Sequence, residues 1–561
     1  MTILKTQSEF GHAPPPQTPY SVITNLPGWD VAKAIREGDH APMKRVVHIY
    51  PRFVATHYAA QLGNEIARYT GHADKAALVY LSPAIWPYTL HHITHPNRGE
   101  ARIEKHDVAF KCVEIAGHRL YVILFNPMAM PIMMLTWQNP GLGVSLRGAE
   151  QLLKGIETIK EVPFEVGMET FPAPSWTPES KVHDALRERI VDLLHRAPRD
   201  ADKVKCTPKD VFLYSTGMAA IFYSSNLLTN YRPGTAVVLG VVFHNTYHHL
   251  IEECPQGMKH FGRVDSEGIS IFENWLKREK DEGRSISYVF VEVPGNPTLD
   301  TTDTARLKKL SEEYDFFLIV DDTIGGFANI DVLAHSDILL SSLTKSFSGY
   351  ANVMGGSIVL NPMSSHYHTL HSLFQESHHN ELFIADAEVL LSNSNDFLER
   401  TEILNRNALA MAEFLHEAIS FPNSPVIKVQ YPSLLDSKSN YDAVLRRGTP
   451  ELPKPGYGCL LTVDFSSVEA ATAFYDRAGF YPSPHLGGHV TIMFPYNMVV
   501  FGKKPEERAY MDKLGVREAS VRISAGLESE EDLIDTLRDA LQAATKVDTG
   551  IRNGYSELIE L

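Results

Sequence analysis

The chain has 561 residues, of which 44% are hydrophobic and 21% charged, a composition typical of a globular protein with enough residues for two or three cores. Its formal net charge of −16 is spread over short stretches of mixed sign, so no basic block could neutralise a row of phosphates, and we expect no nucleic-acid partner. The four cysteines have no CxxC spacing, which argues against a disulfide framework or zinc ribbon and favours a reducing compartment.

The N-terminal region carries few signals of function. Its first 20 residues are rich in proline and have neither the order of a secretory signal nor the arginine content of a transit peptide, so we expect a flexible start to a cytoplasmic protein. The apolar stretch 120–135 is too short to span a membrane and contains two prolines. Residues 107–125 form two apolar runs hinged at 116–118, which predicts a β-hairpin. We treat residues 1–140 as an N-terminal α/β extension of unknown role.

From about residue 200, short apolar runs alternate with helical patterns. The runs lie at 210–215, 236–243, 286–294, 316–322, 337–343 and 355–360. Strands that are apolar on both faces are typical of a mostly parallel sheet covered by helices on each side. The sequence therefore predicts an α/β fold, with a large domain over 141–395 that holds this sheet.

A smaller C-terminal α/β domain is predicted over 396–561. It begins with a helical pattern at 395–418 and continues with apolar runs at 458–465 and 519–526. Helical patterns at 467–479 and 529–546 alternate with these runs. The sequence contains no internal repeat.

Polar residues follow the predicted strands of the large domain. Because the carboxyl ends of parallel strands gather ligand-binding residues, we collect them as one candidate site: Thr216, Gly217, Met218, Asn296, Asp321, Ser342, Thr344 and Lys345. Several histidine-rich stretches also occur, but they lack HExxH and zinc-site spacing, so we expect no metal.

These residue types suit an aromatic aldehyde that carries a phosphate. A glycine turn that opens a helix presents free N–H groups to a phosphate, and the hydroxyls of Ser342 and Thr344 could complete the cradle. Lys345 would supply the amine for a Schiff base. Asp321 would pair with a pyridinium nitrogen, with Asp322 as the alternative partner.

Five motifs resemble those of the cystathionine γ-synthase family of pyridoxal-phosphate enzymes. In chain order they are STGMAAI at 215–221, EVPGNPT at 292–298, LIVDDT at 318–323, SSLTKSFSG at 341–349 and VRISAGLESEEDLIDTLRDAL at 521–541. The stretch LTWQNPGLGVSLRGAE at 135–150 is similar to the fungal branch, which carries an N-terminal extension.

The resemblance implies a fold type I enzyme that binds pyridoxal 5′-phosphate and small amino-acid substrates. It implies that Lys345 binds the cofactor, Asn296 contacts its phenolic oxygen, Asp321 its ring nitrogen, and Arg522 the substrate carboxylate. The implied reaction is γ-substitution on an O-acyl-L-homoserine by L-cysteine, giving cystathionine for transsulfuration and methionine biosynthesis. A homodimer or homotetramer is implied, because a neighbouring subunit supplies the phosphate-binding arginine.

The chain departs from the family pattern in places that set specificity. Arg147 follows Ser145 where the family has Y-x-R, and Tyr50 with Arg52 in IYPRF is a rival pair. The tyrosine that stacks on the cofactor ring is replaced by Phe243, which cannot carry a proton. The serine of the family's S-L-G is replaced by His485. These departures leave two alternatives: another nucleophile, such as sulfide or a carbon nucleophile in secondary metabolism, or a non-catalytic paralogue.

Overall fold

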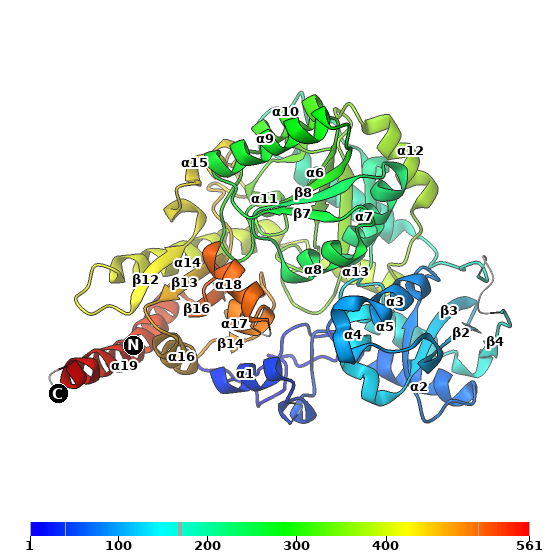
Figure 1. Cartoon of the computed structure of the whole chain (residues 1–561), viewed down its shortest axis with the longest axis horizontal. Helices are drawn as coiled ribbons and strands as arrows, with labels where there is room; N and C mark the ends of the chain where they lie inside the picture. The colour runs from blue at the N-terminus through cyan, green and yellow to red at the C-terminus, as the bar shows by residue number, and fades with distance from the viewer. Residues whose placement is uncertain (1, 40, 166–170, 503, 560–561) are drawn as a thin grey trace.

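The computed structural model describes residues 2–39, 41–165, 171–502 and 504–559, and these contain three β-sheets (Figure 1). The N-terminal sheet has the order β1 (Ala76–Tyr80), β3 (His118–Phe125), β2 (Val108–Ile115) and β4 (Lys160–Glu161). The strands β2 and β3 form the predicted hairpin, with Ala116 and Gly117 at positive φ in its two-residue turn. The helices α2 (His57–Tyr69), α3 (Ile85–Thr94), α4 (Met130–Gln138) and α5 (Leu146–Leu153) complete this part of the chain.

The large sheet confirms the predicted α/β fold. Its order is β5 (Val211–Tyr214), β11 (Gly356–Leu360), β10 (Ile338–Ser341), β9 (Phe317–Asp321), β8 (Ile286–Glu292), β6 (Thr235–Leu239) and β7 (Met258–Phe261). The strand β11 is antiparallel to both its neighbours, and the pairings from β10 to β7 are parallel.

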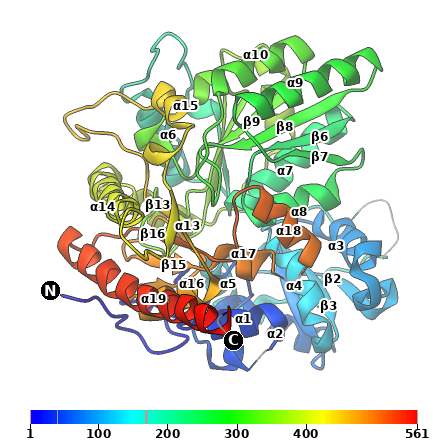
Figure 2. The same cartoon turned by 60° about the vertical axis from the view of Figure 1, so that its left-hand side comes forward.

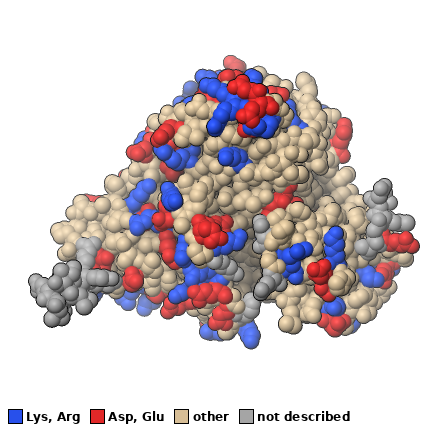
Figure 3. All heavy atoms as spheres, viewed as in Figure 1, with Lys and Arg blue, Asp and Glu red and all other residues tan. Residues whose placement is uncertain are grey.

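Alternation along each strand divides the apolar side chains between two cores. On β9, Phe317 and Ile319 belong to the core shared with α7 (Gly217–Tyr231), and Leu318 and Val320 belong to the core on the opposite face. The opposite face is covered by α6 (Lys181–His195), α9 (Ser266–Asp281) and α10 (Thr304–Tyr314) (Figure 1). Over α9 and α10 the acidic and basic side chains are interspersed (Figure 3).

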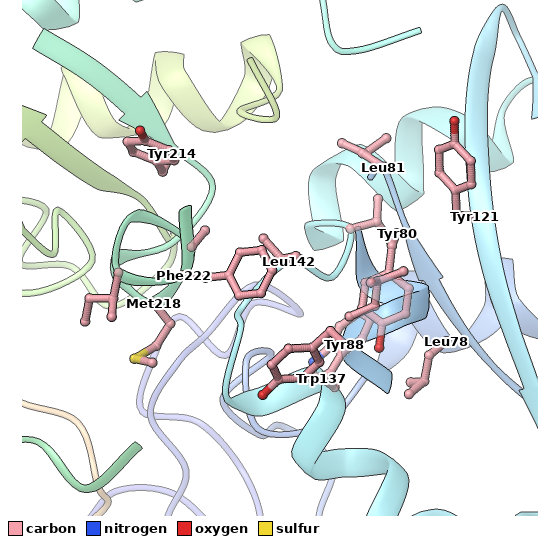
Figure 4. Close-up of a cluster of buried hydrophobic side chains, with 14 of the residues drawn as sticks. Leu78, Tyr80, Leu81, Tyr88, Tyr121, Trp137, Leu142, Tyr214, Met218 and Phe222 are labelled. Atoms are coloured by element: carbon pink, nitrogen blue, oxygen red, sulfur yellow. The ribbon is translucent and has the colours of Figure 1, made fainter. Parts of the chain in front are cut away.

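The core on the α7 face continues into the N-terminal part of the chain. Phe222 of α7 and Tyr88 of α3 lie with their ring centroids 5.6 Å apart in an edge-to-face arrangement. Figure 4 shows Phe222 projecting from α7 toward Leu142, with Tyr88 and Trp137 on the N-terminal side. The N-terminal part is thus packed against the large sheet through a common core.

The C-terminal sheet has the order β12 (Val426–Gln430), β13 (Leu460–Phe465), β16 (Ser520–Ser524), β15 (Ile492–Phe494) and β14 (Tyr481–Pro482). The helices α14 (Phe397–Ala418), α16 (Val468–Arg477) and α19 (Glu530–Ile559) pack on it, and α17 (Tyr496–Val500) follows β15. The domain boundaries at residues 140 and 395 stay predictions.

The first 55 residues run between the N-terminal and C-terminal parts of the molecule (Figures 1 and 2). Their helix α1 (Trp29–Glu37) contacts α16 and α17, and the Trp29 N–H donates to Asp476 at 2.7 Å. The prediction of a flexible start was wrong, because Gly11, Ala13 and Pro14 are buried, and the Gly11 N–H donates to the Asn25 carbonyl at 2.7 Å. Proline content alone did not reveal that apolar residues between the prolines are packed. Among the described residues, no helix is long and apolar enough to cross a membrane.

Candidate active site

Acidic residues end two adjacent strands of the large sheet. The β8–β9 register pairs Glu292 with Asp321, and the β9–β10 register pairs Asp321 with Leu340. Side chains two residues apart on a strand point to the same face, and Phe290 and Ile319 face α7. The Glu292 and Asp321 carboxylates therefore lie on that face as well. The strand-end residues therefore meet, as the parallel topology predicts.

Asp321 ends β9, and the side chain of Asp322, directly after it, makes a different contact. The Asp321 carboxylate accepts a hydrogen bond from the Thr323 N–H at 2.9 Å, and burial raises its pKa. Asp322 accepts instead from the hydroxyl of Ser341, and burial raises its pKa to about 7. Since Asp321 faces the α7 side, the placement supports Asp321 rather than Asp322 as the partner of a ring nitrogen.

Glu292 is a buried acid that was not predicted as a site residue. Its carboxylate accepts from the Phe243 N–H at 2.7 Å, directly before α8 (His244–Glu253). Burial, and next the adjacent Asp321 carboxylate, raise the pKa of Glu292 well above its usual value. The raised pKa favours the protonated form of Glu292, and its hydrogen bond holds the Phe243 backbone at the start of α8. The available signal was a single charged residue within the apolar run 286–294.

The predicted phosphate turn begins α7. The Thr216 hydroxyl accepts from the Ala219 N–H at 2.9 Å and donates to the Gly141 carbonyl at 3.0 Å, so it caps the helix. Met218 is 4% exposed, and its side chain packs in the core. A Cβ added at Gly217 would lie 2.9 Å from Cβ of Ser342, so only glycine lets the turn approach that strand end. The turn thus offers backbone N–H groups at a helix start to an anion.

The hydroxyls of Ser215 and Thr344, near this turn, differ in whether they already have hydrogen-bond partners. The Ser215 hydroxyl, directly before the helix cap, is buried and has no hydrogen-bond partner within the described chain. The Thr344 hydroxyl donates to the Gly355 carbonyl and accepts from the Gly355 N–H, at 3.2 and 3.1 Å. Ser215, which was not predicted separately from its motif, is therefore better placed than Thr344 to receive a ligand. Ser342 adjoins Gly217, but its N–H is already used, because it donates to the Thr323 hydroxyl at 2.8 Å.

Lys345 lies four residues after β10 and is partly buried. Its Nζ lies 3.2 Å from Nδ1 of His485 and 5.0 Å from the ring centroid of Tyr50. Burial lowers the pKa of the amine, and the guanidinium groups of Arg52 and Arg522 lower it further, against an opposing effect of Tyr50. No ion pair to Lys345 forms within the part of the chain that the structure describes. The site therefore favours a neutral, nucleophilic amine.

His485 and Tyr50 flank this amine. Burial, followed by the charges of Lys345 and Arg522, lowers the pKa of His485 well below its usual value, so the imidazole is neutral. Its Nε2 is buried without a partner among the described residues. Burial alone would raise the pKa of Tyr50, but Lys345 and then Arg52 outweigh burial, and the net shift is downward.

The two candidate phosphate arginines occupy different surroundings. Arg52 is 5% exposed, lies with its guanidinium carbon 5.3 Å from the Phe243 ring centroid, and donates to the Gln138 carbonyl at 2.9 Å. Arg147 instead forms an ion pair with Asp386 at 3.3 Å and donates to the Asn352 carbonyl at 2.9 Å. The structure thus brings Arg52, rather than Arg147, to the residues around Lys345.

Arg522, on β16, reaches the site from the C-terminal sheet. It donates to Oδ1 of Asn296 at 3.0 Å and to the carbonyls of Pro484 and His485 at 2.8 and 3.2 Å. The guanidinium also lies 4.9 Å from the ring centroid of Tyr496. Arg522 is 2% exposed and has no carboxylate partner in the described residues, so it is poised to bind an added carboxylate.

The comparisons with known proteins assign this site to a family. The sequence model of the Cys/Met metabolism PLP-dependent enzymes matches residues 205–542, which is more than half of the chain. The chain belongs to the Cys/Met metabolism PLP-dependent enzyme family. It is therefore a pyridoxal-phosphate-dependent enzyme of fold type I.

The relatives of this Cys/Met metabolism enzyme are named for more than one enzyme activity. The cystathionine gamma-synthase-like enzyme iboG2 of Amanita muscaria is 30% identical, over 97% of this chain and 98% of its own. The alanine racemase ungC of Aspergillus violaceofuscus is 29% identical over 95% and 96%. The cystathionine gamma-synthase of Neurospora crassa is 34% identical, over 60% of this chain and 52% of its own. The solved cystathionine gamma synthase of Xanthomonas oryzae shares the fold, with 23% identity, a TM-score of 0.51, and coverage of 65% and 86%.

The residues present fit the family's cofactor. A helix start with an unpartnered Ser215 hydroxyl suits a phosphate, Asp321 suits a ring nitrogen, and the Lys345 amine suits an aldehyde carbon. In the described ranges, no group of three or more His, Cys, Asp or Glu side chains is arranged to hold a metal ion.

Proposed function

We propose that this enzyme catalyses γ-substitution on an O-acyl-L-homoserine, with L-cysteine as the nucleophile expected from the sequence and cystathionine as its product. This proposal rests on the position of His485, which contacts both of the side chains that would act on the substrate, Lys345 and Arg522. Its imidazole meets the Lys345 amine, and its carbonyl accepts from Arg522. The relatives named cystathionine gamma-synthase, or similar to it, support the same reaction.

Pyridoxal phosphate, when bound, supplies an aldehyde that condenses with amines and a ring that withdraws electrons. Phosphate contacts would come from the N–H groups of Gly217 and Met218 and from the Ser215 hydroxyl. Arg52 would supply the balancing positive charge, a role in which a guanidinium can donate two parallel hydrogen bonds. Phe243, positioned by Glu292, would cover the ring face, while Asp321 would hold the ring nitrogen in its protonated form.

The Nζ atom of Lys345 would take and return protons at the α- and β-carbons of the substrate. Its lowered pKa leaves the amine free to accept a proton, which a charged ammonium could not do. The hydrogen bond between this amine and Nδ1 of His485 would fix the position of the amine. Tyr50, on the other side, can exchange a proton with Lys345 because its own pKa is lowered.

Arg522 would hold the α-carboxylate of the substrate. Its present hydrogen bond to Asn296 fixes the guanidinium, while the two backbone carbonyls leave its charge uncompensated. Asn296 would in addition contact the phenolic oxygen of the cofactor. This arrangement orients the substrate so that its α-carbon faces Lys345.

A second candidate is γ-substitution by another nucleophile, such as sulfide or a carbon nucleophile. It is favoured by Phe243 and His485, which replace a proton-carrying phenol and a hydroxyl near the reacting atoms. It is also favoured by the apolar character of the space beside Tyr50. The retention of Lys345, Asp321 and Arg522 argues against a non-catalytic paralogue. A homo-oligomer and a cytoplasmic location belong to the same proposal.

A nucleophile screen tests the reaction. O-acetyl- and O-succinyl-L-homoserine are offered with cysteine, sulfide or a β-keto acid, and the products are identified by mass spectrometry. We expect a product in which the acyl group has been replaced at Cγ. Formation of α-ketobutyrate and ammonia alone with every nucleophile would contradict γ-substitution.

A further inference from the structure

An apolar cavity of about 500 Å³ lies beside the active site. It is enclosed by the N-terminal segment, by α8 and by α17, and its apolar lining includes Ile35, Met43, Ile49, Phe53, Val499 and Phe501. This volume lies within the range of roughly 300–1,000 Å³ that is usual for small-molecule sites. We call it the apolar cavity.

The inner end of the apolar cavity adjoins the reacting groups. Tyr50, which lines it, has its ring centroid 5.0 Å from Nζ of Lys345. Pro484, which also lines it, accepts from Arg522 through its carbonyl at 2.8 Å. Only Tyr50 and Pro484 would therefore separate the inner end of a ligand in this cavity from the Lys345 amine and the Arg522 guanidinium.

Polar and charged side chains also line the cavity, but several of them already have partners. Arg98 is paired with Glu252, and His248 lies 3.5 Å from Glu507. The exception at the inner end is Ser483, which is 1% exposed and whose hydroxyl has no partner in the described part of the chain. One unpartnered hydroxyl beside apolar walls fits a ligand that has a single polar end and an apolar body.

This wall suits cysteine poorly. The ammonium and carboxylate groups of a free amino acid would lose water beside the apolar side chains, and charged groups in the wall such as Arg98 and Glu252 are already paired with each other. An alkyl chain gains instead from leaving water, by about fourfold in affinity for each methylene group buried.

We propose that the apolar cavity binds the second substrate and that this substrate is a nucleophile with an extended apolar chain. This inference rests on the second form of the proposed γ-substitution, in which the nucleophile is not cysteine. With a thiol as the nucleophile, a bond forms between its sulfur and Cγ of the amino acid, and the Cγ–O bond to the acyl group breaks. The acyl group leaves as a carboxylate with the electron pair, and the thiol proton is released. Ser483 contacts the polar end of the nucleophile, and the chain lies toward α1 and α17.

The first test uses n-alkanethiols from ethanethiol to octanethiol as nucleophiles with O-acetyl-L-homoserine and the holoenzyme. We expect kcat/KM to rise about fourfold per added methylene until the cavity is filled, and to exceed the value for cysteine at hexanethiol. Independence from chain length, with cysteine the best nucleophile, would overturn the proposal. It would equally be overturned if lengthening the acyl group to hexanoyl, rather than the thiol, produced the increase.

The second test fills the cavity. Ile35 lines it from α1, whereas Lys33 lies on the exposed side of the same helix. We expect Ile35→Trp to lower the octanethiol-to-ethanethiol ratio of kcat/KM at least tenfold, and Lys33→Trp to leave this ratio unchanged. Val500→Trp, which fills the cavity from α17, should lower it as well. If neither cavity variant changes the ratio, the chain binds elsewhere and the proposal fails.

A third measurement separates this proposal from the proposed function. Calorimetric binding of the unreactive 1-alkanols, from butanol to octanol, should tighten about fourfold per methylene and weaken in Ile35→Trp. Carboxylate release from O-acetyl-L-homoserine reports on γ-substitution itself. Alkanol binding without carboxylate release would contradict the proposed γ-substitution but support the apolar cavity as a binding site. Carboxylate release without alkanol binding would support γ-substitution and contradict the proposed role of the cavity.

Discussion

The amine of Lys345 lies 3.2 Å from Nδ1 of His485, which is a neutral imidazole because burial lowers its pKa. A neutral imidazole carries one N–H, so this hydrogen bond runs from the amine to Nδ1 or from Nδ1–H to the amine, depending on the tautomer. In both cases the hydrogen bond fixes the position of the amine beside His485.

Removal of the imidazole should slow the proton transfers more than it weakens substrate binding. For His485→Ala we expect kcat to fall about 10–100-fold with KM changed little, because a hydrogen bond to the amine is lost. His485→Ser should recover part of the rate, since a hydroxyl can also accept from the amine. Steady-state kinetics on both variants check this. A change confined to KM would show that His485 acts only on substrate binding.

Arg52 should contribute more to cofactor affinity than Arg147. For Arg52→Ala we expect the dissociation constant for pyridoxal phosphate to rise about 10–100-fold, the effect of losing charge-assisted hydrogen bonds. Arg147→Ala removes the partner of the buried Asp386 carboxylate, and so should lower the free energy of unfolding by about 3–5 kcal/mol. Fluorescence titration and urea unfolding measure the two effects. If instead Arg147→Ala weakened cofactor binding and Arg52→Ala did not, Arg147 would be the phosphate ligand.

The site should be complete within one chain. Tyr50 and Arg52 lie beside Lys345 of the same chain, whereas the resemblance implied an arginine from a neighbouring subunit. Co-expressed Lys345→Ala and Arg52→Ala chains should therefore show no more activity than the two variants alone, because every site carries one defect. Recovery of activity in the mixture would show that the arginine crosses between subunits.

The free amine of Lys345 should make the stability of the cofactor-free protein depend on pH. Its pKa is lowered in the folded state, so between that value and its usual value of about 10.4 the unfolded chain binds more protons. The free energy of unfolding contributed by this group thus rises with pH across that window. Urea unfolding of wild type and Lys345→Met should show Met favoured near pH 7, with the difference disappearing as pH approaches about 10.4. A pH-independent difference would contradict a lowered pKa.

The sequence predicted the large sheet well because its central strands are apolar on both faces. The runs 286–294 and 316–322 contain β8 and β9, and their polar ends meet as expected for parallel neighbours. The strand β7, by contrast, was missed. Its four residues include Lys259 and His260, and it lies at the sheet edge, where one side is open and no apolar run is needed.

Other parts of the site depend on contacts between distant parts of the chain. The motif IYPRF suggested Tyr50 and Arg52 as a pair, but nothing local shows that residue 50 contacts residue 345. The uses of the Thr216 and Thr344 hydroxyls also required the structure, since both bind backbone groups that are remote in sequence. Motif spacing identified the residue types at the site, whereas their hydrogen-bond partners are set by packing of the three sheets.

The lysine that holds the cofactor can be identified directly. The holoenzyme is reduced with borohydride, digested, and analysed by mass spectrometry, with Lys345→Ala as the control. We predict a pyridoxyl group on Lys345 and no labelled peptide from the control. A pyridoxyl group on a different lysine, or full activity in Lys345→Ala, would contradict the assignment of this buried amine as the reacting group.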